Sequence, residues 1–337
     1  MQQASPTITN AIEAFGLVPE DWDCVCLGNN GGYSGANLWR LSPIRQKAVQ
    51  PAWCLRRWPM SVTAKKNRSQ CQLIQGTLRT AIRRGFPPSL LPVARPSREG
   101  HATWVTGKAV FEMTRWLPGE ANYCQVPTER KLRSMMTTIA QFHQTHRTDS
   151  ELGNPPGIAK RIDFINDLNN GLLAKIESAA DIDNRFGTLA LELTGNYRRL
   201  SPRILLQLLK VRDNHFPIQL CIRDLRHEHV FFEGENVSAI VDFGAVGPDH
   251  VAADLSRLMG DLVSSSPTNW TEALDYYNDC FALSTAEREL IAVYDQSTTM
   301  LAGLNWMKWI LLENRNFGEI QPIINRLERC RLRMLDW

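Results

Sequence analysis

The sequence predicts an α+β protein with a small β-rich N-terminal lobe, residues 1–118, and a large, mainly helical C-terminal lobe, residues 119–337. Two observations support this prediction. Short β-prone runs separated by glycines dominate the first third of the chain, whereas apolar residues at helical spacing dominate the rest. The change falls at Leu117-Pro118-Gly119, where proline and glycine interrupt both patterns.

The N-terminal lobe is expected to contain strands and turns around one helix. CVCLG and LWRL flank the glycine-rich turn GNNGGYSGAN, and PAWCLRRW alternates as a further strand that ends at Pro59. From about 62 to 84 the apolar residues recur at helical spacing, and Gly85 is a stop signal. TWVTGKAVFEMTRW then predicts a hairpin around Thr106-Gly107.

The C-terminal lobe is expected to be helical from Thr128, where a threonine cap opens TERKLRSMMTTIAQFHQTH. Further helices are expected at 162–176, 186–196, 202–213, 253–263, 270–281 and from 285 to near the end. Only CIRD and the hairpin HVFFEGENVSAIVDF are expected to interrupt them. A β-rich lobe, a Pro-Gly hinge and a helical lobe with one hairpin suggest a nucleotide held between two lobes.

Composition narrows the class of protein. With 43% apolar and 22% charged residues the chain is typical of a soluble globular protein, and its net charge of +3 is too small to argue for nucleic acid or membrane. No apolar run approaches the ~18 residues of a spanning helix, and the N-terminus lacks the pattern of a signal peptide. The eight cysteines are scattered and form no C-x-x-C pair, which favours reduced thiols. We therefore expect a cytoplasmic protein that does not associate with membranes.

Two aspartates indicate a site for phosphoryl transfer. Asp224 follows a short β-run, where its carboxylate could meet a substrate hydroxyl, and Asp242 heads a Phe-Gly turn, where its side chain could bind a cation. The 18 positions between them (242 minus 224) accommodate one hairpin, which would return both acids to one edge. Either aspartate alone would more often cap a turn or a helix, but RDL followed by DFG favours the catalytic interpretation.

The segment IRDLRHEHVFF…IVDFGAVGPDHVAADLSRL resembles the catalytic segment of the aminoglycoside phosphotransferase and choline kinase-like family, which has a protein-kinase-like fold. The family's usual form is H-G-D-x-H-x-x-N, then I-D-F/W, then G-D-P-x-x-D-L-A. Weaker similarity extends over most of the chain. GGYSGANLW resembles the phosphate loop, CLRRW the strand with the phosphate-binding base, EMTRWLPG the hinge, and TIAQFHQTH the helix after it.

The resemblance implies a role for each matching residue. Asp224, preceded by Arg223, would orient or deprotonate a hydroxyl of a small-molecule acceptor. Asp242, with His229, would bind Mg²⁺, with Mn²⁺ as the alternative, and Asp254 would support the catalytic loop. The residues implied to bind ATP are Gly31, Gly32, Ser34, Gly35 and Arg56, with the main chain around Met113 and Arg115.

The sequence departs from the family pattern at its charged positions. His229 replaces the metal-binding asparagine, and it could either ligate a metal through nitrogen or pack in the loop without one. Arg56 stands where a lysine contacts the phosphates, and its fork geometry differs from that of lysine. No acidic residue lies between Asp23 and Glu99, so the helix at 62–84 cannot supply the usual glutamate partner. Gln72 or Gln75 are the candidate substitutes.

These features lead to two functional expectations. The first is an ATP-dependent phosphotransferase acting on an aminoglycoside, choline or sugar-like hydroxyl, and the alternative is a catalytically weakened or inactive nucleotide-binding scaffold. The basic residues of the N-terminal lobe would favour ATP or simply be solvated, and the absence of interleaved aromatic residues argues against nucleic acid. An aminoglycoside would favour an acidic pocket. The acids that could contribute to one, although solvation on helix surfaces explains them equally well, are Asp163, Asp167, Glu177, Asp181 and Asp183. The sequence leaves the acceptor and the oligomeric state open.

Overall fold

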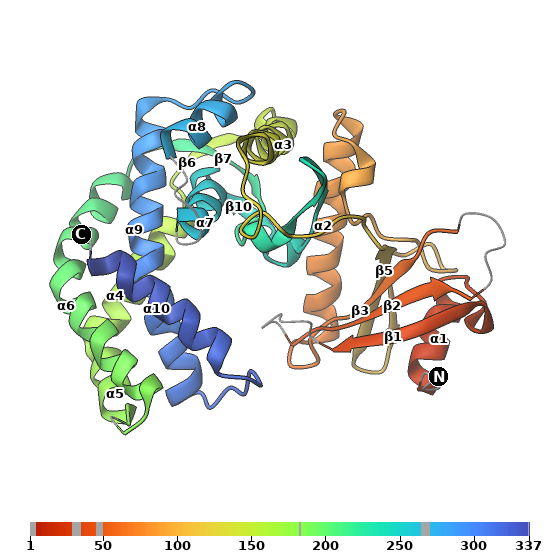
Figure 1. Cartoon of the computed structure of the whole chain (residues 1–337), viewed down its shortest axis with the longest axis horizontal. Coiled ribbons are helices and arrows are strands. Elements are labelled where there is room, and N and C mark those ends of the chain that lie inside the picture. The colour runs from red at the N-terminus through yellow and green to blue at the C-terminus, as the bar shows by residue number, and fades with distance from the viewer. Residues whose placement is uncertain (1–4, 29–34, 45–49, 182, 264–269, 336) are drawn as a thin grey trace. The chain divides into compact units, whose positions relative to one another are not determined.

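The computed structural model describes residues 5–28, 35–44, 50–181, 183–263, 270–335 and 337. The chain forms two compact units (Figure 1). The first contains Met1–Tyr123, Thr128–Thr138 and Glu228–Val246, and the second contains Cys124–Pro127, Ile139–His227 and Gly247–Trp337. The α+β class is confirmed, because a small antiparallel sheet lies in the first unit and helices dominate the second. A domain boundary after Pro118 stays a prediction.

The first unit is built on a five-stranded antiparallel sheet of order β1-β2-β3-β5-β4. Its strands are β1 (Trp22–Gly28), β2 (Asn37–Pro43), β3 (Trp53–Arg57), β4 (Thr103–Thr106) and β5 (Ala109–Arg115). Each strand expected from the sequence is confirmed, including the β4–β5 hairpin. Helix α2 (Ala64–Arg83) matches the expected helix, and the Thr63 side chain caps it.

One face of this sheet is covered by α1 (Pro6–Ala14), a helix that the sequence analysis did not expect (Figure 1). Ile8, Ile12 and Phe15 pack in a core cluster with Leu41 and Leu55 of the sheet. The helix is only nine residues long and begins with β-branched residues of modest helix propensity. Tertiary packing therefore stabilises it more than local sequence does.

The hairpin of β8 (Val230–Glu233) and β9 (Asn236–Ile240) also belongs to the first unit. It pairs with the segment after β5, because Glu120 and Phe232 exchange backbone hydrogen bonds and Ser238 Oγ donates to the Pro118 carbonyl. Gly119 has a φ of +89°, and a Cβ there would lie 2.7 Å from the Phe232 carbonyl oxygen. Only glycine fits this close approach without strain.

The second unit contains a short sheet of order β10-β7-β6. A short β-run was expected at CIRD, but β7 (Phe216–Cys221) lies earlier and ends at its cysteine, and neither β6 (Glu151–Gly153) nor β10 (Gly247–Asp249) was expected. Three residues are too few to show an alternating pattern, so these strands form because β7 offers a partner on each side.

Helices make up the rest of the second unit. They are the C-terminal part of α3 (Glu129–Arg147), then α4 (Pro156–Asp167), α5 (Leu173–Ala179), α6 (Arg185–Arg212), α7 (Ala252–Val263), α8 (Trp270–Asn278), α9 (Thr285–Met307) and α10 (Gln321–Leu335). Within the described ranges, no helix has both the length and the hydropathy needed to cross a membrane.

Three helix boundaries differ from expectation. A single helix over 162–176 is wrong, because a π-turn with Gly171 at φ +110° separates α4 from α5. Two helices around 186–213 are also wrong, because α6 runs through Pro202 without interruption. Buried Tyr197, Leu200 and Ile204 hold this helix together by packing, which offsets the cost of an interior proline. Finally, α9 and α10 are separate helices rather than one continuous helix.

Candidate active site

Arg56 and Glu112 are opposite each other on β3 and β5 of the first unit. Leu55 lies in the core beneath α1, so Arg56 and Glu112 project from the other face of the sheet, where α2 packs. Residues directly opposite in an antiparallel pair have Cβ atoms within ~4.5–5.5 Å. The strand arginine therefore has an acid beside it, although α2 contains none.

Helix α2 contacts this acid through two polar side chains. Gln75 Nε2 donates to Glu112 Oε1 at 2.8 Å, and the Cys71 thiol donates to the same oxygen at 3.3 Å. Burial raises the pKa of Cys71 well above its ordinary value, and the Glu112 carboxylate raises it further. Of the two glutamines considered from the sequence, Gln75 is buried and bonded to the acid, whereas Gln72 is exposed.

Asp242 lies on the turn after β9, also in the first unit. Its backbone is in the left-handed region (φ +57°), and its side chain accepts from the Gly244 amide at 3.4 Å. A Cβ built on Gly244 would lie 3.1 Å from Asp242 Oδ1 and 3.5 Å from Arg56 Nη2. The proposed phosphate-binding base and the proposed metal-binding acid thus converge on this turn. Gln70 of α2 holds the turn by donating to the Gly244 and Val246 carbonyls.

His229 faces Asp242 within the same unit. Its Nε2 lies 3.7 Å from Asp242 Oδ2, and 46% of the Asp242 side chain is exposed. The Val241 amide donates to the His229 carbonyl at 2.9 Å, which ties the two segments together. One carboxylate and one imidazole make a donor set that fits a divalent cation, and Mn²⁺ accepts such nitrogen more readily than Mg²⁺. The described residues contain no cluster of three or more His, Cys, Asp or Glu side chains able to hold a metal.

Asp224 belongs to the second unit, on the loop after β7. Arg257 of α7 donates from Nε to Asp224 Oδ1 at 2.6 Å, and 40% of the Asp224 side chain stays exposed. The sequence analysis missed Arg257. A signal was present, because Arg257 follows Asp254 by three positions and so shares its helix face.

Asp254 fixes the loop that carries Asp224. The Ile222 amide donates to Asp254 Oδ2 at 2.8 Å, and the Arg223 amide donates to Oδ1 at 2.5 Å. His143 of α3 completes this fully buried cluster, with Nε2 at 3.1 Å from Asp254 and Nδ1 at 2.8 Å from the Tyr277 hydroxyl. The expected supporting role of Asp254 is confirmed, and His143 is buried beside it.

Arg223 adopts a left-handed conformation with φ +65°, which is uncommon outside glycine. Its guanidinium occupies the space that a Cβ on Gly247 would need, with Cζ 2.7 Å from that position. The Arg223 side chain therefore folds back on the start of β10. The guanidinium of Arg223 thus lies against β10, whereas 40% of the neighbouring Asp224 side chain is exposed.

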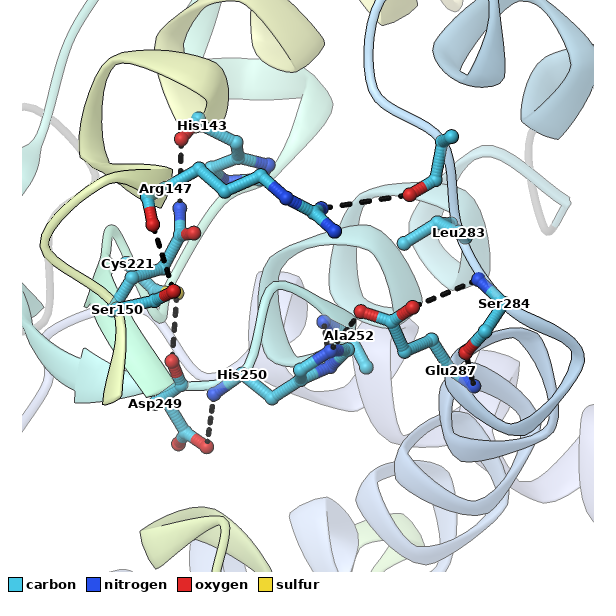
Figure 2. A network of polar contacts seen from close by, with 12 residues as sticks. His143, Arg147, Ser150, Cys221, Asp249, His250, Ala252, Leu283, Ser284 and Glu287 are labelled. Carbon is cyan, nitrogen blue, oxygen red and sulfur yellow. Dashed lines mark hydrogen bonds and ion pairs between the residues drawn. The ribbon is translucent and has the colours of Figure 1, made fainter. Parts of the chain in front are cut away.

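A polar network holds the segment after β10 in the second unit (Figure 2). The Cys221 thiol donates to the Asp249 carbonyl, and His250 Nε2 lies 3.1 Å from Glu287 Oε1. Burial alone would raise the pKa of Glu287, but hydrogen bonds from His250 and Ser284 outweigh it and lower this pKa to about 2. The network anchors the residues that lead into α7.

Only some of the other residues predicted to bind the nucleotide lie among those that the structure describes. Gly31, Gly32 and Ser34 lie outside the described residues. Gly35 has a φ of +77°, and Arg115 is exposed at the end of β5. The Met113 carbonyl accepts from the Arg95 amide at 2.7 Å, so an adenine ring would need another main-chain group here.

Solved structures with a similar fold are protein-kinase-like phosphotransferases. An aminoglycoside phosphotransferase from Alicyclobacillus acidocaldarius has a TM-score of 0.60 and 13% identity, covering 89% of this chain and 88% of that one. Spectinomycin phosphotransferase, solved with ADP and spectinomycin, has a TM-score of 0.63 and 12% identity, covering 98% and 94%. Amicoumacin kinase, solved with AMP-PNP and Ca²⁺, has a TM-score of 0.64 and 12% identity, covering 99% and 93%. At these identities the similarity establishes the fold alone.

The fold is thus that of protein-kinase-like phosphotransferases. The sequence model of a family described as "Phosphotransferase enzyme family" matches residues 26–289, which is most of the chain. The chain belongs to this family. Comparison with curated proteins gives no match.

Proposed function

We propose that the protein transfers the γ-phosphoryl group of ATP to a hydroxyl of a small molecule, in the cytoplasm and with a divalent metal. The observation that carries this proposal is the loop before Asp224. Asp254 binds two successive loop amides, so the Asp224 carboxylate is presented on a rigid support while remaining partly exposed. An aspartate that only capped a turn or a helix would not need its loop to be held by a second aspartate.

The proposed reaction assigns one role to each group. The acceptor oxygen attacks the γ-phosphorus, the bond from this phosphorus to the β–γ bridging oxygen breaks, and ADP leaves. Asp224 orients the acceptor hydroxyl and receives its proton. Arg56 binds phosphate oxygens through its planar fork. Asp242 and His229 would hold Mg²⁺ or Mn²⁺, which supplies positive charge to offset the charge of the phosphates.

The similar structures support the substrate classes. One of them holds ADP with spectinomycin and another holds AMP-PNP with Ca²⁺. A further one is a choline/ethanolamine kinase family protein from Mesorhizobium loti, with a TM-score of 0.54 and 15% identity. Together they favour a nucleoside triphosphate, a divalent cation and a small hydroxyl compound as ligands of this chain.

The experiment for this proposal compares Asp224→Ala with wild-type protein. Loss of the orienting carboxylate should lower turnover by about 10²–10⁴-fold, because positioned acid–base groups contribute on this order. ATP affinity should stay within about twofold, since the carboxylate acts on the acceptor. Turnover is measured as ADP formation against a panel of sugars, amino alcohols and hydroxy acids, and affinity by calorimetry. Asp275→Ala, an exposed aspartate on α8, is the matched control. Equal turnover in the Asp224 variant would refute the assignment.

A second candidate is a nucleotide-binding scaffold with weak or no catalysis. His229 and Arg56 favour it, because both replace the side chains usual in the family. Ligands that bind the folded state raise its thermal midpoint by mass action. A metal-dependent shift with ATP and measurable ADP formation favours the enzyme, whereas a shift without ADP formation favours the scaffold.

A further inference from the structure

Helix α7 carries three charged side chains on one face, and each of them contacts the loop that carries Asp224. Asp254, Arg257 and Asp261 are spaced i, i+3 and i+7, so they lie in a row along the helix. The helix and the loop both belong to the second unit. This row of three residues is called the α7 stripe below.

The first two members of the α7 stripe hold the start and the middle of the loop. Asp254 accepts hydrogen bonds from the successive amides of Ile222 and Arg223, and so fixes the main chain before Asp224. Arg257 donates from Nε to Asp224 Oδ1 at 2.6 Å, and so holds the side chain. Main chain and side chain are thus held from the same helix.

The third member of the α7 stripe holds the end of the loop. Asp261 Oδ2 is hydrogen-bonded to His227 Nδ1, and Arg226 Nη2 lies 3.6 Å from Asp261 Oδ1. The order of the contacts along α7 is therefore the order of the residues along the loop. One helix supports the whole segment 222–227.

Helix α7 is well suited to this support because it is firmly packed. Its Leu255, Leu258 and Leu262 side chains are fully buried, and the helix packs against α9 (Figure 1). Groups held by packed helices are placed more precisely than groups held only by loops. Arg257 therefore ties the Asp224 carboxylate to a rigid element of the fold.

The bond between Arg257 and Asp224 contributes more to the direction of the carboxylate than to stability. The two side chains are 33% and 40% exposed, and ion pairs this open to solvent contribute little to the free energy of folding. Their separation of 2.6 Å is nevertheless short, as in charge-assisted hydrogen bonds. Such a bond restricts the carboxylate to fewer orientations than a free aspartate would sample.

We propose that Arg257 is a positioning residue for the transfer reaction, which holds the Asp224 carboxylate toward the acceptor hydroxyl as the middle member of the α7 stripe. This role rests on the proposed function and identifies the residue that fixes its orienting carboxylate. Arg257 acts through Asp224 and needs no contact with the nucleotide. Because Nε donates the bond, a lysine, whose ammonium lies one bond further along the side chain, can supply a similar donor.

The first test measures turnover, as ADP formation, in Arg257→Gln and Arg257→Lys. Loss of positioning can cost about 10²-fold, so Arg257→Gln should lower kcat by about 10- to 100-fold while the KM for ATP stays within about twofold. Arg257→Lys should keep kcat within about fivefold of wild type, because a charged donor remains. Arg288→Gln, an arginine of α9 that pairs with Asp275, is the matched control and should behave as wild type.

A double-mutant cycle separates an effect through Asp224 from a direct effect. In the Asp224→Ala background there is no carboxylate to position, so adding Arg257→Gln should lower kcat further by less than about twofold. A general structural role, or a contact of Arg257 with the transferred phosphoryl group, would instead lower kcat by the same factor in both backgrounds. Arg257→Met, which keeps most of the aliphatic side chain, serves in both tests if Arg257→Gln does not fold.

Hydrogen exchange provides a readout that does not depend on turnover. The amides of the segment 222–227 should exchange about tenfold faster in Arg257→Gln than in wild type, because local opening becomes easier when one of the loop's supports is lost. Arg257→Lys should restore most of the protection. The strand before the loop, β7, should exchange at the wild-type rate in both variants.

The possible results distinguish this role from the proposed function. Wild-type kcat in Arg257→Gln, together with slow turnover in Asp224→Ala, would overturn the positioning role and leave the proposed function intact. Equal kcat in the Gln and Lys variants, or equal losses in the two backgrounds, would also overturn it. If wild-type protein forms no ADP with any acceptor, the proposed function fails instead. The exchange rates of the segment 222–227 then decide alone whether Arg257 holds the loop.

Discussion

At the scale of single residues, the acid opposite Arg56 lies on a strand instead of a helix. Glu112 faces Arg56 across β3 and β5, and Gln75 of α2 bonds to Glu112. The sequence analysis named Gln75 as a candidate but did not find Glu112. Register between strands that are distant in sequence sets this pairing, and no local pattern reveals it.

The position of Glu112 opposite Arg56 predicts what happens to ATP binding when this carboxylate is removed from β5 and then supplied from α2. Glu112→Gln should raise the Kd for ATP by about tenfold, because the uncharged side chain no longer holds the guanidinium electrostatically. Adding Gln75→Glu returns a carboxylate to the same cluster from α2 and should restore most of the affinity. Calorimetric titration with ATP checks both variants. An unchanged Kd in the single variant, or a weaker one in the double variant, would show that Glu112 does not position Arg56.

The residues of the two candidate loops could be predicted to different extents. RDL and DFG predicted the roles of Asp224 and Asp242, which stay predictions, and the later Asp254 was assigned to the loop support that the structure confirms. Arg257 was missed, since its importance depends on the direction of α7. The convergence of Asp224 with Asp242 stays a prediction, because the two belong to different units.

At the scale of elements, hairpins were the most predictable features. EGEN between two apolar runs predicted the β8–β9 turn, and Thr106-Gly107 predicted the β4–β5 turn. The course of α6 through Pro202 could not be predicted, because proline locally favours a break and only packing against buried neighbours opposes it. The two three-residue strands depend entirely on their partner β7.

Alanine substitutions at two glycines of the first unit should lower the free energy of unfolding by different amounts. Gly119→Ala should destabilise the protein by at least about 2 kcal/mol more than Gly107→Ala, because only Gly119 has backbone atoms within 3 Å of the added Cβ. Both have positive φ, so the shared backbone strain of about 1–2 kcal/mol cancels in the comparison. Urea unfolding measures the difference, and equal losses would mean that the segment at Gly119 moves away from the hairpin at little cost.

At the scale of the whole molecule, the depressed pKa of Glu287 predicts how stability depends on pH. A carboxyl whose folded pKa is lowered from 4.5 to about 2 stabilises the protein above pH 4.5, and this contribution is lost as pH falls toward 2. Glu287→Gln should therefore lower the free energy of unfolding by about 3 kcal/mol at pH 7, since each unit of the shift from 4.5 to about 2 corresponds to 1.36 kcal/mol.

The difference between wild type and Glu287→Gln should shrink as pH falls below 4.5. Thermal midpoints at pH 7, 5 and 3 provide the measurement. Glu289→Gln, an exposed glutamate on the same helix, should track wild type at every pH. A constant difference between wild type and Glu287→Gln across this range would mean that packing, and not ionisation, accounts for the effect of the variant.

The first unit combines segments that lie far apart in the sequence, and this affects the order in which its parts can fold during synthesis. This unit needs the β8–β9 hairpin, which follows Tyr123 by about a hundred residues in the sequence. The sheet emerges from the ribosome well before the strands that pair with residues 118–120 have been translated. Since domains tend to fold as their residues emerge, part of the surface of the early sheet stays uncovered until the β8–β9 hairpin has been synthesised. Long-range pairing of this kind slows folding, so chaperone binding to the nascent chain would be concentrated in that interval.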